Sequence, residues 1–182
     1  MTPSLHTVGL VAFRMAPALL SSANFTFAWV THILIGAFKS RHMPKDTGMA
    51  AMPYWFKHMR DHVLWFIFAS YVPNTILGIA NAYNRVPGLD AGGGGATSVG
   101  YYASWAYLLG AFFSFGHFPL TFRWRMVGLN LTLLDEKKSQ ATREVAYTEF
   151  MRTNWLRSFW ASFTAMTCFT VGSILWAAEA IA

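Results

Sequence analysis

Four stretches of this sequence contain no Asp, Glu, Lys or Arg, and this feature constrains the fold most. They cover residues 15–38, 63–84, 99–122 and 158–178. Each is close to the ~20 residues that cross a bilayer core as a helix. Backbone groups in lipid must be satisfied within the segment, and the apolar content is too continuous for the alternation of a membrane barrel. The sequence therefore predicts an all-α integral membrane four-helix bundle. We expect a single transmembrane domain over residues 1–182, with spans at about 12–38, 56–84, 99–124 and 152–178.

The basic residues indicate the orientation of this bundle. Twelve of the 14 Lys and Arg residues lie in or beside two regions, residues 39–60 and 123–157. By the positive-inside rule both regions are cytoplasmic, and both termini are on the non-cytoplasmic side. The formal net charge of +6 is then explained by anchoring to anionic lipid headgroups, without a nucleic-acid partner. We expect a protein of an intracellular membrane such as the endoplasmic reticulum, with membrane lipid as a partner. The sequence is also compatible with a homodimer.

Turn-forming and aromatic residues suggest where the helices begin and end. Pro53 is expected to begin the second helix, and the fourth is expected to begin near Thr148. Residues 135–143 are polar and are expected to form an exposed loop or an amphipathic extension. The third helix carries an aromatic group at its non-cytoplasmic end, which is typical of an interfacial belt. This group comprises Tyr101, Tyr102, Trp105 and Tyr107.

Four histidines fall at a similar depth near the predicted cytoplasmic face. His32 and His117 precede the first cytoplasmic charges, and a rise of about 1.5 Å per residue places both roughly 10 Å inside the boundary. His58 and His62 are four residues apart on the opening turns of the second helix, so they share one helix face. Ionisable residues are costly in lipid, so their convergence predicts a functional site.

Imidazole groups at this spacing are suited to metal binding. We predict that His32, His58, His62 and His117 hold iron, copper or haem. A cofactor-free mechanism is the alternative, in which His62 or His117 acts as a general base near neutral pH. A histidine near an interface is also often a simple polar cap, and the HxxxH spacing alone is a weak metal signal.

Asn154 and Arg157 are three residues apart on one face at the cytoplasmic entry of the fourth span. An arginine at this position can anchor headgroups, or it can hold a phenolate or carboxylate through two hydrogen bonds. We include both residues among the candidate catalytic residues. The aromatic residues of the same half of the bundle are mostly core, but they also offer a lining for a flat apolar substrate.

Three motifs between residues 119 and 157 resemble a known family. They are Pro119-Leu120-Thr121, then Met126 and Asn130 with Leu133-Leu134, and finally Asn154-Trp155-Leu156-Arg157. The sequence resembles the small four-span membrane proteins that include the fungal anthrone oxygenases, which show Pro-x-Thr, Met-x-x-x-Asn with paired leucines, and Asn-x-x-Arg. The resemblance implies oxidation of an aromatic polyketide, or a similar hydrophobic small molecule, by molecular oxygen.

The first functional hypothesis is therefore a membrane-embedded oxygenase with its pocket in the cytoplasmic half of the bundle. Two alternatives stay open at this point. One is a haem- or metal-binding membrane electron-transfer protein without substrate chemistry. The other is a non-catalytic tetraspan subunit, which would function normally without its histidines.

Overall fold

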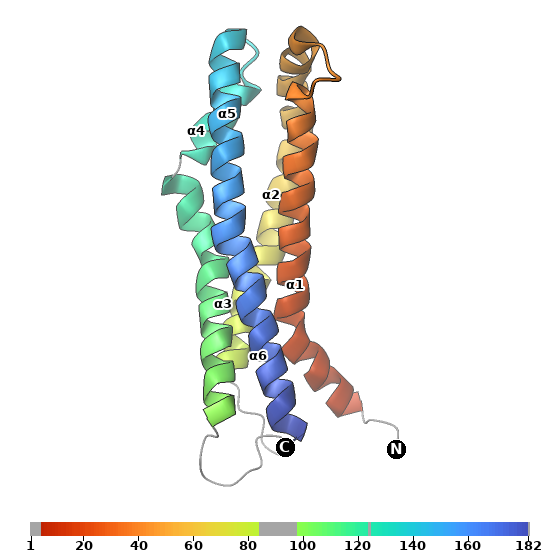
Figure 1. Ribbon diagram of the computed structural model, residues 1–182, viewed down its shortest axis with the longest axis vertical. Helices are drawn as coiled ribbons and strands as arrows, with labels where there is room; N and C mark the ends of the chain where they lie inside the picture. The colour runs from red at the N-terminus through yellow and green to blue at the C-terminus, as the bar shows by residue number, and fades with distance from the viewer. Residues whose placement is uncertain (1–4, 84–97, 124, 182) are drawn as a thin grey trace.

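The computed structural model describes residues 5–83, 98–123 and 125–181, and its helices form one elongated bundle (Figure 1). The helices are α1 (Leu5–Gly36), α2 (Lys45–Tyr83), α3 (Ser98–Arg123), α4 (Met126–Leu134), α5 (Gln140–Arg157) and α6 (Thr164–Ile181). A 3-10 turn, η1 (Ala37–Lys39), follows α1, and a π-helical segment, η2 (Ser158–Phe163), joins α5 to α6. No strand occurs in the part of the chain that the structure describes, so the all-α prediction is confirmed there.

Four long rods form the bundle, because α5, η2 and α6 run on as one helix. α1 packs against α2, α2 against α3, α3 against α6, and α6 against α1. The beginning of α1 and the end of α6 lie at the same end of the bundle (Figure 1). We call this the terminal end, and we call the opposite end, with the 37–44 and 135–139 connections, the basic end.

The predicted start of the second helix was wrong. α2 begins at Lys45, so Pro53 lies inside it. The turns around Pro53 are held by a large apolar cluster at the basic end, in which Met49, Met52 and Phe56 are buried. Tertiary packing of this kind outweighs the backbone hydrogen bond that proline removes.

The helix that contains the fourth span also begins earlier than predicted, at Gln140. The Ser139 side chain accepts a hydrogen bond from the Thr142 backbone N–H and caps the first turn. Tyr147 and Phe150 then pack into the same apolar cluster at the basic end. Residues 140–143 therefore take the helical extension that was one of the two alternatives for this stretch.

Between α3 and α4 the chain changes direction at Arg125, whose φ of 53° lies in the left-handed region. This conformation is uncommon for a residue with a side chain, and it ends one helix before the next begins. Met126 and Leu133 of α4 then pack into the cluster at the basic end. The short helix therefore closes the bundle over the end of α3.

A second, smaller apolar cluster lies toward the terminal end. Tyr107 and Phe169 are fully buried there, together with Ala18, Ala111 and Ala165. Tyr107 was predicted to belong to an interfacial belt, and this was wrong, because its hydroxyl donates to the Arg14 carbonyl oxygen at 2.9 Å inside the bundle. Tyr101, Tyr102 and Trp105 are exposed, in keeping with a belt.

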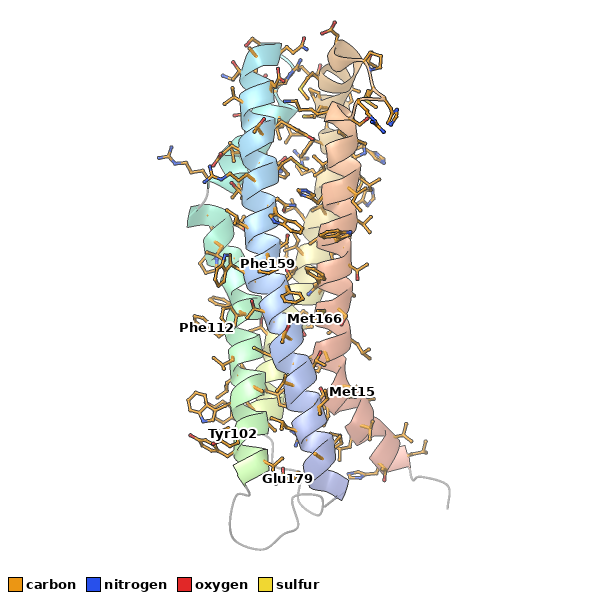
Figure 2. All side chains as sticks on the ribbon, viewed as in Figure 1. Met15, Tyr102, Phe112, Phe159, Met166 and Glu179 are labelled. Atoms are coloured by element: carbon orange, nitrogen blue, oxygen red, sulfur yellow. The ribbon has the colours of Figure 1, made fainter. Side chains whose placement is uncertain are left out.

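The outside of the bundle exposes many large apolar side chains. Tyr102 and Phe112 point outward from α3 in Figure 2, and Phe112 is 68% exposed. Other exposed side chains on the remaining rods are Leu19, Ile33, Ile76, Trp160 and Ile174. An exposed apolar surface this extensive is typical of a protein that lipid surrounds.

Among the described residues, three helical stretches are long and apolar enough to cross a membrane. They are Leu5–Lys39, His62–Tyr83 and Gln140–Glu179. α3 has the length of the remaining predicted span, with 26 residues, but Tyr, Trp, Ser, Gly and His lower its hydropathy. These findings are consistent with an integral membrane protein.

Candidate functional site: a polar layer between two apolar clusters

Polar side chains are buried at mid-depth in the bundle, between the two apolar clusters. The level of this layer closest to the terminal end is a set of hydrogen bonds. The Asn74 amide nitrogen donates to the Ser21 hydroxyl at 2.7 Å and to the Ser114 hydroxyl at 3.3 Å. These three residues come from α2, α1 and α3, so they join three rods at one height. Such bonds between helices help to hold a bundle together in lipid, where apolar burial contributes little.

One turn closer to the basic end, His117 of α3 is buried with 3% of its surface exposed. Its ring stacks on the ring of Tyr71 from α2, with centroids 4.0 Å apart. The Tyr71 hydroxyl in turn shares a hydrogen bond of 2.7 Å with the Ser162 hydroxyl of η2. Neither ring nitrogen of His117 has a hydrogen-bond partner among the described residues. This imidazole is therefore held in place by stacking while both nitrogens stay available.

Arg157 lies at the next level and is also buried, with 9% exposed. Its guanidinium donates to the Thr121 hydroxyl at 2.8 Å and to the Asn154 side-chain oxygen at 2.7 Å. The charge interacts electrostatically with the Tyr71 hydroxyl and with the His117 ring. Three predicted site residues, Asn154 and Arg157 of α5 and His117 of α3, thus belong to one polar layer.

The π-helical segment η2 begins directly after Arg157. The Ser158 backbone N–H, at the start of this segment, donates to the carbonyl oxygens of both Asn154 and Trp155. Ser158 and Ser162 are both buried on the inner face of this segment. π-helical insertions in α-helices are frequent at functional sites.

The remaining predicted histidines lie elsewhere. His58 and His62 are exposed on α2, with their rings 5.6 Å apart. His32 faces α5, where its ring lies 5.3 Å from that of Trp155. It helps to line an open groove of about 460 Å³ between α1 and α5. The groove is lined by Trp29, His32, Lys39, Tyr147, Thr148, Met151, Arg152 and Trp155.

The structure does not bring the four histidines into one donor set. Within residues 5–83, 98–123 and 125–181 there is no group of three or more His, Cys, Asp or Glu side chains that could hold a metal ion. His58 and His62 are close enough to act together, but His117 is separately buried against Tyr71. The described residues therefore show no donor set shared by the four histidines, the iron, copper or haem site stays a prediction, and we derive no step through such a group.

Several residues of the layer were missed by sequence reasoning. They are Ser21, Asn24, Tyr71, Asn74, Ser114, Ser158 and Ser162. The site prediction rested on histidines, an arginine and a family-like motif, whereas most of these residues carry small neutral side chains. A signal was present, because small polar residues recur at spacings of three or four within otherwise apolar runs, which places them on one helix face.

The three motifs that resemble the fungal anthrone oxygenases meet in the structure. Thr121 of the first motif accepts the hydrogen bond of Arg157 from the last. Met126 and Leu133 of the middle motif are buried in the apolar cluster at the basic end. The first and last motifs are therefore joined by a hydrogen bond at the buried arginine, and the middle motif belongs to the apolar cluster at the basic end.

The fold and site together define a helical, membrane-type protein with a polar site inside the bundle. Comparison with curated proteins agrees with the family resemblance. The chain is 24% identical over 171 residues to a Penicillium citrinum protein named epoxidase gkaX, covering 94% of this chain and 98% of the relative. It is 27% identical over 164 residues to a Mollisia scopiformis protein named probable epoxidase scpX, covering 88% and 93%. No protein-family model matches the chain, and no solved structure matches it.

Proposed function

We propose that this protein is a membrane-embedded oxygenase that oxidises a hydrophobic aromatic small molecule with O₂ in the polar layer. The observation that carries the proposal is the buried His117, whose two ring nitrogens have no partner among the described residues. The two relatives named epoxidases support an oxidative enzyme. The exposed apolar surface supports entry of a hydrophobic substrate from the lipid.

In this mechanism His117 is the general base. A ring nitrogen takes the proton from a carbon acid, such as a methylene between two aromatic rings. The electron pair left on carbon forms a bond to O₂, and a peroxide results. Loss of water then cleaves the O–O bond and leaves a ketone, so that one CH₂ group and one O₂ give one C=O group and one water. No further reductant is needed.

Arg157 stabilises the negative charge that develops on the substrate. Its guanidinium is already oriented by Thr121 and Asn154, so it does not need to reorganise during the reaction. Preorganised donors of this kind contribute a large part of catalysis in sites from which water is excluded. Asn154 is a positioning residue in this scheme, because it acts through the arginine.

The names of the relatives favour epoxidation as a second candidate reaction. An alkene, O₂, two electrons and two protons give an epoxide and water, so this reaction needs an electron donor. The two reactions are separable by assay. Anthrone should be oxidised without a donor, whereas epoxidation of 1,2-dihydronaphthalene should require a reductant such as ascorbate.

The test is oxygen uptake by the purified protein in lipid nanodiscs, with anthrone as the probe. We expect equal consumption of anthrone and O₂, with anthraquinone as the product. Replacing His117→Leu should reduce the rate at least about 100-fold, since general-base catalysis contributes about 10²- to 10⁴-fold. The matched control is His6→Leu, which removes an exposed histidine near the beginning of α1 and should leave the rate unchanged.

Oxygen uptake by a His62→Leu variant distinguishes a general base at His117 alone from the predicted site that several histidines share. Full activity in this variant, with loss in His117→Leu, supports His117 as a lone base. Equal loss in both variants, together with a stoichiometric transition metal by elemental analysis, would favour a metal-assisted reaction instead. A folded His117→Leu variant with wild-type oxygen uptake would refute both.

A further inference from the structure

Asn24 is a buried amide of the polar layer that has no role in the proposed mechanism. It lies on α1 with 1% of its surface exposed. Neither its side-chain oxygen nor its side-chain nitrogen has a hydrogen-bond partner among the described residues. Both ends of this amide are therefore unsatisfied within the bundle, which is unusual for a polar side chain at this depth.

The hydrogen bonds of the layer fix the height of Asn24. Ser21, Asn74 and Ser114 lie at one level because they are bonded to one another. One helical turn closer to the basic end, the same three helices carry Asn24, Tyr71 and His117. Asn24 and His117 are therefore at the same height, on two helices that do not neighbour each other around the ring of rods.

The four groups at this height differ in their bonding. Tyr71 and Ser162 satisfy each other at 2.7 Å. Asn24 and His117 are fully buried from opposite sides of the bundle, and together they offer four side-chain atoms without a partner in the described parts of the chain. These atoms include donors and acceptors, which suits a ligand atom that lies between the two side chains.

A purely structural role does not account for Asn24. A structural amide in a bundle needs a partner on another helix, as Asn74 has. Asn81 has one too, since its amide nitrogen donates to the Phe13 carbonyl oxygen at 3.1 Å. Leaving a buried polar group unsatisfied destabilises the folded state, so an apolar residue would serve the fold better at position 24.

We propose that Asn24 is a substrate-binding residue that donates a hydrogen bond to a carbonyl or hydroxyl oxygen of the substrate, opposite His117. The substrate class is then a hydrophobic ring system with an oxygen substituent that lies across the bundle axis from the carbon to be oxidised. This inference rests on the proposed function, because it names the substrate group that the same layer recognises.

The test compares two tricyclic probes that differ in one carbonyl group, anthrone and 9,10-dihydroanthracene. Binding is measured without oxygen, by quenching of tryptophan fluorescence in nanodiscs, so that no turnover is needed. The wild type should bind anthrone about ten-fold more tightly, which is within the range of one hydrogen bond. In Asn24→Leu this preference should disappear, through weaker binding of anthrone and unchanged binding of dihydroanthracene.

Stability supplies the matched control. Asn24→Leu should unfold at the same denaturant concentration as the wild type or at a higher one, because no protein hydrogen bond is lost. Asn81→Leu, an equally buried replacement, should unfold at a lower concentration, because it loses the bond to Phe13.

The outcomes separate this inference from the proposed function. A ten-fold preference that Asn24→Leu abolishes supports the inference even if anthrone is not oxidised. Oxidation of anthrone by an Asn24→Leu variant that keeps the preference would overturn the inference alone. Equal affinity of the wild type for the two probes, or no binding of either, would also overturn it.

Discussion

Replacing Thr121→Val removes one acceptor from the buried arginine while almost preserving the volume of the side chain. In the wild type, Arg157 Nη1 donates to the Thr121 hydroxyl at 2.8 Å, and that hydroxyl donates to the His117 carbonyl oxygen at 2.7 Å. Hydrogen bonds to charged groups contribute about 1.5–3 kcal/mol. We therefore expect the free energy of unfolding to fall by about this amount, measured by denaturant unfolding in mixed micelles.

The oxidation rate of the folded Thr121→Val protein should also fall. The guanidinium would keep its bond to Asn154 but lose the bond to Thr121, so it would be oriented less firmly toward the substrate. A loss of about 10-fold or more in kcat/KM corresponds to the lower end of the same energy range. The matched control is Thr167→Val on the lipid-facing side, where the hydroxyl bonds only to the carbonyl of Phe163 in its own helix. If Thr121→Val proves as stable and as active as Thr167→Val, the role assigned to the Arg157–Thr121 bond is refuted.

Two further predictions test the packing of the bundle. Tyr71→Phe keeps the stacked ring but loses the hydrogen bond to Ser162. It should lower the free energy of unfolding by about 0.5–1.5 kcal/mol. If the losses of stability in Tyr71→Phe and Ser162→Ala simply add in the double variant, the two hydroxyls do not interact. Gly110→Ala places a new methyl 2.6 Å from carbons of the Phe169 ring and should destabilise by about 1–3 kcal/mol. Gly116→Ala, with no atom within 4 Å of the new methyl, should not, and equal stability of the two alanine variants would contradict this account.

The four rods could be predicted from the sequence because charge-free length alone specifies a membrane helix. Their polar extensions could not. The early turns of α2 and the turns of α5 before Thr148 lie outside the predicted helices. They are polar, and they are helical because Met52, Phe56 and Phe150 pack together nearby. That packing involves residues about a hundred positions apart, and hydropathy along one helix does not reveal it.

The sequence predicts heights along the helices but not the directions in which the side chains point. Counting residues from the nearest charge gives His117 and His32 the same height. It does not show that His117 is buried inside the bundle, whereas His32 faces a groove at the surface. The direction depends on which helix faces meet, and this is a property of the whole bundle. Asn154 and Arg157 were selected by their shared helix face at the entry of the fourth span and by the family-like motif, and the structure places both side chains in the polar layer.

The charge of Arg157 gives the strongest reason to expect an anionic ligand. A cation inside a membrane bundle is costly, and it is usually balanced by a carboxylate or used for function. Within the described part of the chain, its hydrogen-bond partners are a hydroxyl and an amide oxygen, both neutral. The positive charge is therefore oriented but not neutralised, and a negative charge that forms on the substrate beside His117 would provide the missing balance. In the proposed mechanism a neutral substrate would gain less from this site than its deprotonated form. The same charge that burdens the folded protein would then lower the energy of the substrate carbanion.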